Sequence, residues 1–216
     1  MSAIHAIPVS NQLPDGDYSI GTAFLARSSD EIFLIGAAHS PTRSQPHTRW
    51  LEWPSAFQVW RSPVENLTLP LFADGLPRVP LFRFERRNSG SDLLSDMMAV
   101  PVSKLHFGHL PSIDLTDERT APTAGTAVTV YGYPDRQELP KWPYTPATPA
   151  AGILRSIEPH LIFAGPMPTL VGHSGGPVFA DSGIFVGMMI GHEDDGRRAI
   201  VPAAAIRRLI TRAAAS

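Results

Sequence analysis

The chain of 216 residues contains no cysteine, so no disulfide can cross-link its fold. Its net charge is only −2 and its basic residues form no long run, which argues against nucleic acid as a partner. The sequence also lacks an apolar stretch long enough to span a membrane, and its first residues lack the basic start and apolar core of a signal peptide. We therefore expect a cytoplasmic protein that acts on neither nucleic acid nor membrane.

The composition indicates a globular protein built from short elements. Hydrophobic residues make up 43% of the chain and charged residues 18%, values typical of folded rather than disordered proteins. The 22 prolines and 17 glycines interrupt the chain often, which favours many short strands over a helical bundle. A chain of this length can bury a substantial core in one domain or in two small lobes.

The most informative segment is residues 171–178, which read VGHSGGPV and place Ser174 among glycines. A serine hydroxyl is a weak nucleophile until a base removes its proton and hydrogen-bond donors stabilise the resulting oxyanion. Gly172, Gly175 and Gly176 allow the backbone to fold tightly around the serine and to aim N–H groups at a reacting carbonyl. Taken alone, this segment could equally be a glycine-rich hairpin turn.

A histidine that could serve as the base follows a predicted buried strand. Residues 32–39 read IFLIGAAH, so an apolar run leads through two alanines to His39. The segment 21–25, GTAFL, is predicted to be the partner strand of a hairpin, with residues 27–31 as the connecting turn. Taken alone, an Ala-Ala-His segment is more often only the end of a strand.

The carboxylate that would fix the imidazole tautomer is predicted to be Asp96. It is followed at once by the apolar run 97–102, which is long enough for a strand. Asp92 is the alternative, but only two leucines follow it. An aspartate before a strand is usually a solvated turn residue, so this assignment depends on its combination with His39 and Ser174.

These motifs together resemble the trypsin-like (chymotrypsin-fold, S1-type) serine peptidases. The family carries a GDSGGP or GNSGGP loop, a TAAH segment and a DIAVL strand, and the order His39, Asp96, Ser174 is the family's order. Segments 128–134 and 183–190 resemble two further strands of the family. Because cysteine is absent, the chain resembles the disulfide-free bacterial branch. Position 173 departs from the pattern, with histidine where aspartate or asparagine is usual.

The resemblance implies an all-β fold of two antiparallel six-stranded β-barrels with a C-terminal α-helix. We expect an N-terminal lobe over 18–110, a connector over 110–119, a C-terminal lobe over 120–202 and the helix over 203–214. The active site would lie between the lobes.

The helix is also predicted from the residues themselves. Pro202 suits the first position of a helix, and Ile206, Leu209 and Ile210 recur at helical spacing. The proline-rich segment 135–149 is expected to be a stiff surface loop.

The implied activity is that of a serine endopeptidase that cleaves a polypeptide substrate through an acyl-enzyme, with no cofactor and no metal. The backbone N–H groups of Gly172 and Ser174 would form the oxyanion hole. Thr169, Ile190 and His192 would bind the substrate side chain that precedes the cleaved bond.

The predicted pocket leaves the substrate preference open. Positions 168 and 169 carry no aspartate, which argues against a preference for arginine or lysine. Thr169 and His192 could accept an acidic side chain, and the alternative, which we favour slightly, is a small apolar pocket.

Other hypotheses remain at this stage. One alternative is a catalytically latent or inactive trypsin-like domain that acts as a peptide-binding module, and another is a peptidase that waits for a regulatory protein partner. His173 is predicted to make a local hydrogen bond under the loop, with its side chain directed away from the nucleophile. His106 and His109 are interpreted as structural or exposed rather than as metal ligands.

Overall fold

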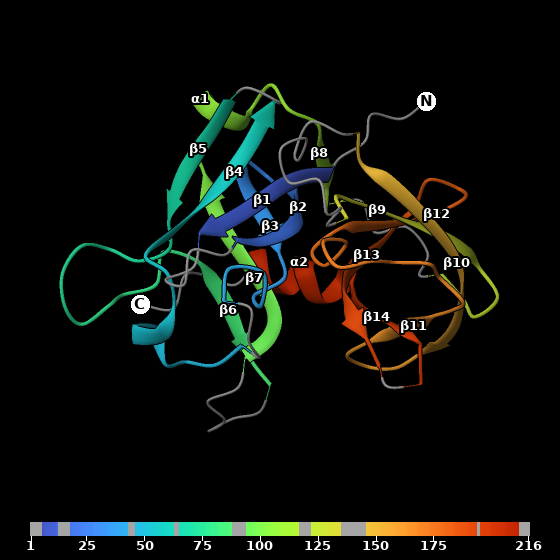
Figure 1. Cartoon of the computed structure of the whole chain (residues 1–216). Coiled ribbons are helices and arrows are strands. Elements are labelled where there is room, and N and C mark those ends of the chain that lie inside the picture. Colours follow the sequence, from blue (N-terminus) through green and yellow to red (C-terminus); the bar gives the residue numbers. More distant parts are fainter. Residues whose placement is uncertain are drawn as a thin grey trace.

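The computed structural model describes residues 6–12, 18–42, 46–62, 65–87, 94–116, 122–134, 146–193 and 195–211. The chain forms two lobes of β-strands that lie side by side, and helix α2 (Ala203–Thr211) packs between them (Figure 1). No helix in the described ranges is long and apolar enough to cross a membrane. The predicted all-β class with a C-terminal helix is confirmed.

The first lobe is an eight-stranded sheet. Seven strands follow the order β5-β4-β1-β2-β3-β7-β6, and the eighth, β8, pairs in parallel with β2. Their bounds are β1 Ala6–Gln12, β2 Tyr18–Ser28, β3 Glu31–Gly36, β4 Ala56–Ser62, β5 Glu65–Pro70, β6 Arg83–Arg86, β7 Leu94–Val102 and β8 Ser112–Asp114. Over the described residues this sheet curves into a half-barrel, where a closed six-stranded barrel was predicted.

Strand β2 is buried on both of its faces, which explains its long apolar run. Successive side chains of a strand point to opposite sides of the sheet. Ala23 and Leu25 pack into the core of the first lobe, whereas Phe24 and Ala26 pack into a second core that faces the other lobe. The neighbouring β3 follows the same rule, so the segment that leads to His39 is held from two sides.

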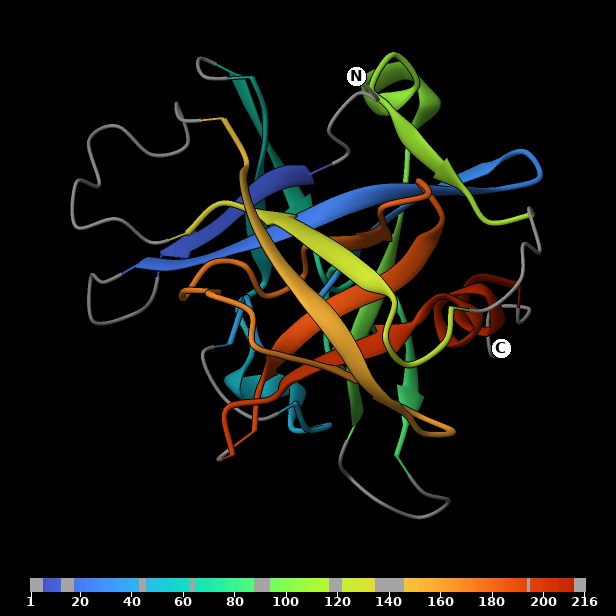
Figure 2. The same ribbon diagram turned by 90° about the vertical axis from the view of Figure 1, so that its right-hand side faces the viewer.

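The second lobe is a closed six-stranded antiparallel barrel, as predicted (Figure 2). Its strands follow the order β10-β11-β14-β13-β12-β9. Their bounds are β9 Ala127–Gly132, β10 Thr148–Ile157, β11 Ile162–Ala164, β12 Pro177–Ala180, β13 Phe185–His192 and β14 Arg198–Pro202. Burial alternates along β9 and β10, which directs apolar side chains such as Val130 and Leu154 into the barrel interior, where Ile200 of β14 joins them.

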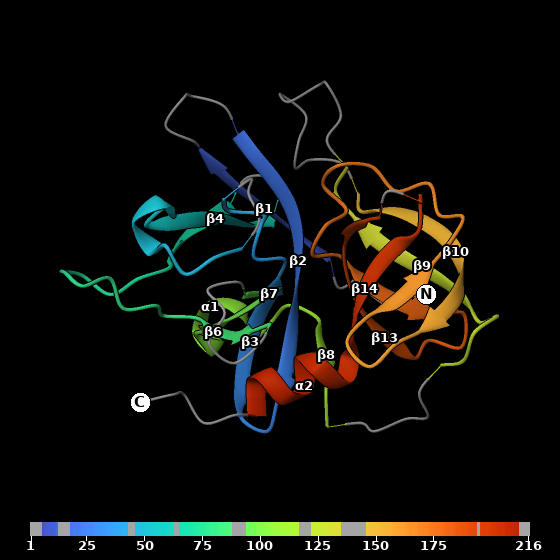
Figure 3. The same cartoon turned by 90° about the horizontal axis from the view of Figure 1, so that it is seen from below.

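Helix α2 joins the two lobes into one core (Figure 3). As predicted, Ile206, Leu209 and Ile210 are buried, and they pack with residues of β2, β3 and β7 and with residues of the second barrel. Arg207 donates from Nε to the carbonyl of Leu115 at 2.7 Å. Residues 212–214 of the predicted helix lie outside the described residues.

Two strands lie where the sequence predicted none. Strand β1 joins the first sheet ahead of the predicted start of that lobe at residue 18, and β8 lies inside the predicted connector 110–119. The short helices η1 (Trp50–Glu52) and α1 (Lys104–Phe107) complete the first lobe. Residues 135–145 of the proline-rich segment lie outside the described residues.

Candidate active site

His39 lies just beyond the end of β3, as the sequence predicted. The two alanines before it, Ala37 and Ala38, are fully buried. A tight turn follows, in which the Ser40 N–H donates to the Ala37 carbonyl at 3.1 Å and the Thr42 N–H donates to the His39 carbonyl at 3.1 Å. The buried strand therefore ends in a fixed turn that carries the partly exposed imidazole.

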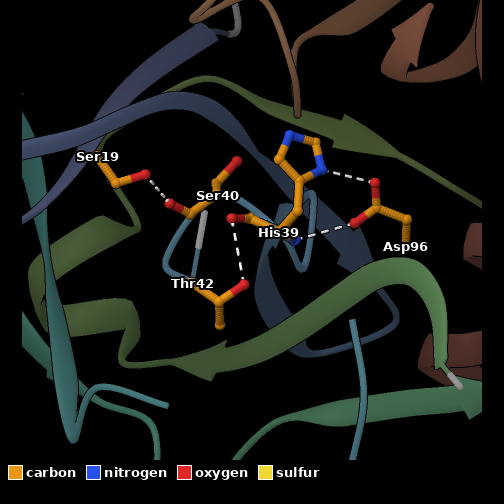
Figure 4. Close-up of polar contacts among 5 residues, drawn as sticks. All are labelled: Ser19, His39, Ser40, Thr42 and Asp96. Atoms are coloured by element: carbon orange, nitrogen blue, oxygen red, sulfur yellow. Dashed lines mark hydrogen bonds and ion pairs between the residues drawn. The ribbon is translucent and has the colours of Figure 1, made fainter. Parts of the chain in front are cut away.

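Both carboxylate oxygens of Asp96 form hydrogen bonds with His39 (Figure 4). Oδ2 lies 2.6 Å from Nδ1 of the imidazole, and Oδ1 accepts the His39 backbone N–H at 2.9 Å. The sheet register explains the contact: β7 pairs with β3 so that Met98 faces Gly36, and Asp96 therefore extends past the end of β3. With Nδ1 bound to a carboxylate, Nε2 of the ring is left to act on a reacting group.

The alternative carboxylate, Asp92, lies outside the described residues. The Asp96 side chain is 13% exposed and the His39 side chain is 31% exposed, so the hydrogen-bonded pair is sheltered on the carboxylate side and accessible on the imidazole side. A general base needs this arrangement, because its ring must reach the substrate while its partner stays fixed.

Two buried polar side chains hold the backbone that follows His39. Asn11 of β1 donates from Nδ2 to the Pro41 carbonyl at 3.0 Å. Ser19 of β2 donates its hydroxyl to the Ser40 carbonyl (Figure 4). These two residues were not identified from the sequence, and their role depends on contacts between segments far apart in the chain.

Ser174 lies in the loop between β11 and β12, and hydrogen bonds tie this loop to both lobes. The Thr22 N–H of β2 donates to the Ser174 carbonyl at 2.9 Å. On the other side, the Gly175 N–H donates to the Met189 carbonyl at 2.7 Å, and the Met189 N–H donates to the Gly176 carbonyl at 3.0 Å. The loop is therefore an extension of the second barrel that docks on the first sheet.

The docking brings the serine loop to the segment that carries His39. Gly175 has φ +85°, and a Cβ atom built on it would lie 1.8 Å from the Thr22 carbonyl oxygen and 3.2 Å from the Ala37 backbone nitrogen. Only glycine fits there. No hydrogen bond joins the Ser174 hydroxyl to His39 in the described part of the chain, and such catalytic contacts are commonly loose before substrate binds.

Residues 172–174 form the backbone segment that the sequence assigns to the oxyanion hole. Gly172 is buried with φ +95°, its carbonyl accepts the Thr22 hydroxyl at 2.6 Å, and the His173 carbonyl accepts the Gly176 N–H at 2.9 Å. Among the described residues, the N–H groups of Gly172 and Ser174 donate to no protein acceptor. The role of these two groups as an oxyanion hole stays a prediction.

His173 makes the predicted local hydrogen bond under the loop. Its side chain is buried, and Nδ1 lies 3.2 Å from both the backbone nitrogen and the carbonyl oxygen of Leu170. Burial lowers the pKa of His173 below its ordinary value of 6.5, and the backbone groups of Leu170 and Thr148 oppose that shift.

The predicted substrate-binding residues come from two segments that the structure links. Thr169 is half-buried in the stretch before the serine loop, and Ile190 and His192 lie at the end of β13. His192 pairs with Arg198 of β14, whose Nε donates to the Met167 carbonyl at 3.1 Å. The assignment of these three residues as a pocket stays a prediction.

The remaining histidines of the sequence hypothesis lie apart from the site. His106 and His109 are both exposed, at and just beyond the end of α1. Across the ranges that the structure covers, no group of three histidine or acidic side chains could hold a metal ion.

No protein-family model matches the chain, and no curated protein matches its sequence. The fold, in contrast, has clear relatives among solved structures. The serine endoprotease from Yersinia pestis superposes with a TM-score of 0.62 and 15% identity, over 96% of this chain and 62% of that one. The chain thus spans less than two thirds of the Yersinia protein's length.

Two further structures are those of the Rv3671c protease from M. tuberculosis. Its active form gives a TM-score of 0.56 with 17% identity, over 98% of this chain and 82% of that one. Its inactive form gives a TM-score of 0.55 with 16% identity, over 95% and 87%. At this level of identity the likeness concerns the fold. The chain has the trypsin-like fold of these bacterial serine endoproteases.

Proposed function

We propose that this chain is a serine endopeptidase that uses Ser174 as nucleophile, His39 as general base and Asp96 as the carboxylate that orients the base. The observation that carries the proposal is the double contact of Asp96 with the imidazole and the backbone of His39. A carboxylate that only capped a turn would need the backbone contact alone. The second contact, at 2.6 Å to Nδ1, sets the tautomer of the ring.

The reaction follows from this geometry. Ser174 Oγ attacks the carbonyl carbon of a peptide bond while His39 Nε2 takes the hydroxyl proton. The oxyanion is stabilised by the N–H groups of Gly172 and Ser174, and the imidazolium by Asp96. His39 then returns the proton to the leaving amine, which leaves an acyl-enzyme. Water, deprotonated by His39, hydrolyses the ester and restores the serine.

Hydrolysis of an unfolded protein tests the proposal. The wild type is expected to cleave a denatured substrate such as casein, and Ser174→Ala is expected to abolish cleavage. Ser182→Ala is the matched control, because Ser182 is exposed in the turn between β12 and β13 and takes no part in the site. Equal cleavage by Ser174→Ala and wild type would contradict the proposal.

The preference of the pocket is the finer part of the proposal. Thr169, Ile190 and His192 would bind the side chain that precedes the cleaved bond, and we expect small apolar residues to be favoured over acidic ones. A peptide library varied at that single position measures the preference directly. Selective cleavage after glutamate or aspartate would overturn the apolar assignment and leave the catalytic proposal intact.

The alternative is a catalytically latent domain that binds peptides or that waits for a regulatory partner. The N–H groups of Gly172 and Ser174 have no acceptor within the described residues, which supports the active form, because a group satisfied within the protein could not also bind an oxyanion. Cytoplasmic location and regulation by a partner stay predictions from the sequence.

A further inference from the structure

We propose that the hydroxyl of Thr22 is a positioning group for the oxyanion hole, which it sets by bridging the two lobes. The inference rests on the proposed function, because it assigns a role within the same site. Thr22 belongs to β2 of the first lobe and is fully buried. In a strand surrounded by apolar side chains, a buried hydroxyl needs a hydrogen-bonding reason to be there.

The Thr22 hydroxyl acts both as a hydrogen-bond donor and as an acceptor. It accepts the Tyr133 backbone N–H at 2.9 Å, just beyond the end of β9 in the second barrel. It donates to the Gly172 carbonyl at 2.6 Å, in the serine loop. These partners lie 111 and 150 positions away in the sequence. The hydroxyl therefore connects the first sheet, the second barrel and the serine loop at one point.

Hydrogen bonds hold the carbonyls of three consecutive residues in the serine loop. The Thr22 hydroxyl holds the carbonyl of Gly172, the Gly176 N–H holds that of His173, and the Thr22 N–H holds that of Ser174. The carbonyl of one residue and the N–H of the next share one planar peptide group, so holding the Gly172 and Ser174 carbonyls orients the peptide groups on either side of the one that carries the Ser174 N–H. Thr22 supplies two of these three contacts.

The consequence concerns the direction of the Gly172 and Ser174 N–H groups. Gly172 has φ +95°, a conformation in which glycine can rotate to other states at little energetic expense. With the Gly172 carbonyl held by Thr22, a rotation that turns the 172–173 peptide group breaks a buried hydrogen bond, and this group lies between the Gly172 and Ser174 N–H groups. The hydroxyl thereby keeps the loop in the state in which both N–H groups remain available to an oxyanion.

The test compares three variants by the rate at which a fluorophosphonate probe modifies Ser174 and by peptide hydrolysis. Thr22→Val keeps the shape of the side chain and removes the hydroxyl. Removing one oxyanion donor lowers kcat by about 10²–10³-fold, so a misaligned pair is expected to lower kcat and the labelling rate at least ~10-fold, with KM changed less than ~3-fold. Thr22→Ser keeps the hydroxyl and is expected to stay within about threefold of wild type.

The outcomes separate this inference from the proposed function. Wild-type labelling with an equally fast Thr22→Val variant overturns the role of the hydroxyl and leaves the peptidase proposal standing. Equal slowing in Thr22→Val and Thr22→Ser also overturns it, because the loss would then come from packing. An unlabelled wild type overturns the peptidase proposal itself. If Thr22→Val does not fold, Thr22→Cys provides the same comparison, since its thiol fills the space but hydrogen-bonds weakly.

Discussion

Two glycine-to-alanine substitutions with nearly equal backbone strain test how tightly the serine loop docks on the first lobe. Gly175 has φ +85° and Gly183 has φ +81°. An alanine in this left-handed conformation costs about 1–2 kcal/mol at either position. The surroundings differ: a Cβ on Gly183 meets nothing within 4 Å, whereas a Cβ on Gly175 would lie 1.8 Å from the Thr22 carbonyl oxygen.

The expected magnitudes follow from that difference. Gly183→Ala should lose only the conformational term, which lowers Tm by about 2–8 °C in a chain of this size. Gly175→Ala adds the overlap with the Thr22 backbone, and forcing extra volume into a packed site costs about 1–3 kcal/mol more. Its Tm should therefore fall by about 2–12 °C below that of Gly183→Ala.

The activity of the same two variants gives the second readout. A fluorophosphonate should label Ser174 of the Gly183→Ala variant at the wild-type rate, because the turn between β12 and β13 lies outside the site. Gly175→Ala should be labelled far more slowly, because the loop must move away from Thr22. Equal Tm values for the two variants, together with undiminished labelling of Gly175→Ala, would refute the docking described above.

Three further outcomes are expected. Asp96→Asn should lower kcat by about 10⁴-fold, because the amide favours the wrong tautomer of His39 while its oxygen can still accept the backbone N–H; an unchanged kcat would remove Asp96 from the mechanism. The unfolded state binds a proton at His173 more readily than the native state, so stability should fall as pH drops below 6.5, and urea unfolding of His173→Asn should show a shallower fall. Ile206→Ala should destabilise the chain by about 2–5 kcal/mol and the exposed Arg208→Ala by less than about 0.5 kcal/mol, as measured by denaturation; similar losses would contradict the joint core.

Much of the fold could be predicted because the strands near the site are buried on both faces. The run that leads to His39 is apolar at every position, since alternate side chains fill two different cores. The helix at the end of the chain was equally legible, because Ile206, Leu209 and Ile210 recur at helical spacing and all three are buried.

Strand β1 escaped prediction because its local features resemble those of a loop. It contains Pro8, and its polar residues Ser10 and Asn11 carry no alternating apolar pattern. Both polar side chains are buried and hydrogen-bonded, Ser10 to the indole of Trp60 and Asn11 to the Pro41 carbonyl. Such partners, far apart in sequence, cannot be inferred from periodicity.

In the candidate site, too, some residues could be identified from local sequence and others only from the structure. Ser174, His39 and Asp96 were identified because each stands in a short recognisable segment, and the structure brings His39 and Asp96 into direct contact. Thr22 was seen only as part of a strand. Its hydrogen bonds reach the end of β9 and the serine loop, so its importance became visible only in three dimensions.

The central claim is that Ser174 is a nucleophile activated by the His39–Asp96 pair. The most direct measurement is covalent labelling with a fluorophosphonate, followed by mass spectrometry to locate the adduct. The account predicts one adduct on Ser174 in the wild type, none on Ser174→Ala, and slow labelling of His39→Ala. An unlabelled wild type that is folded, or an adduct that persists unchanged in Ser174→Ala, would contradict it.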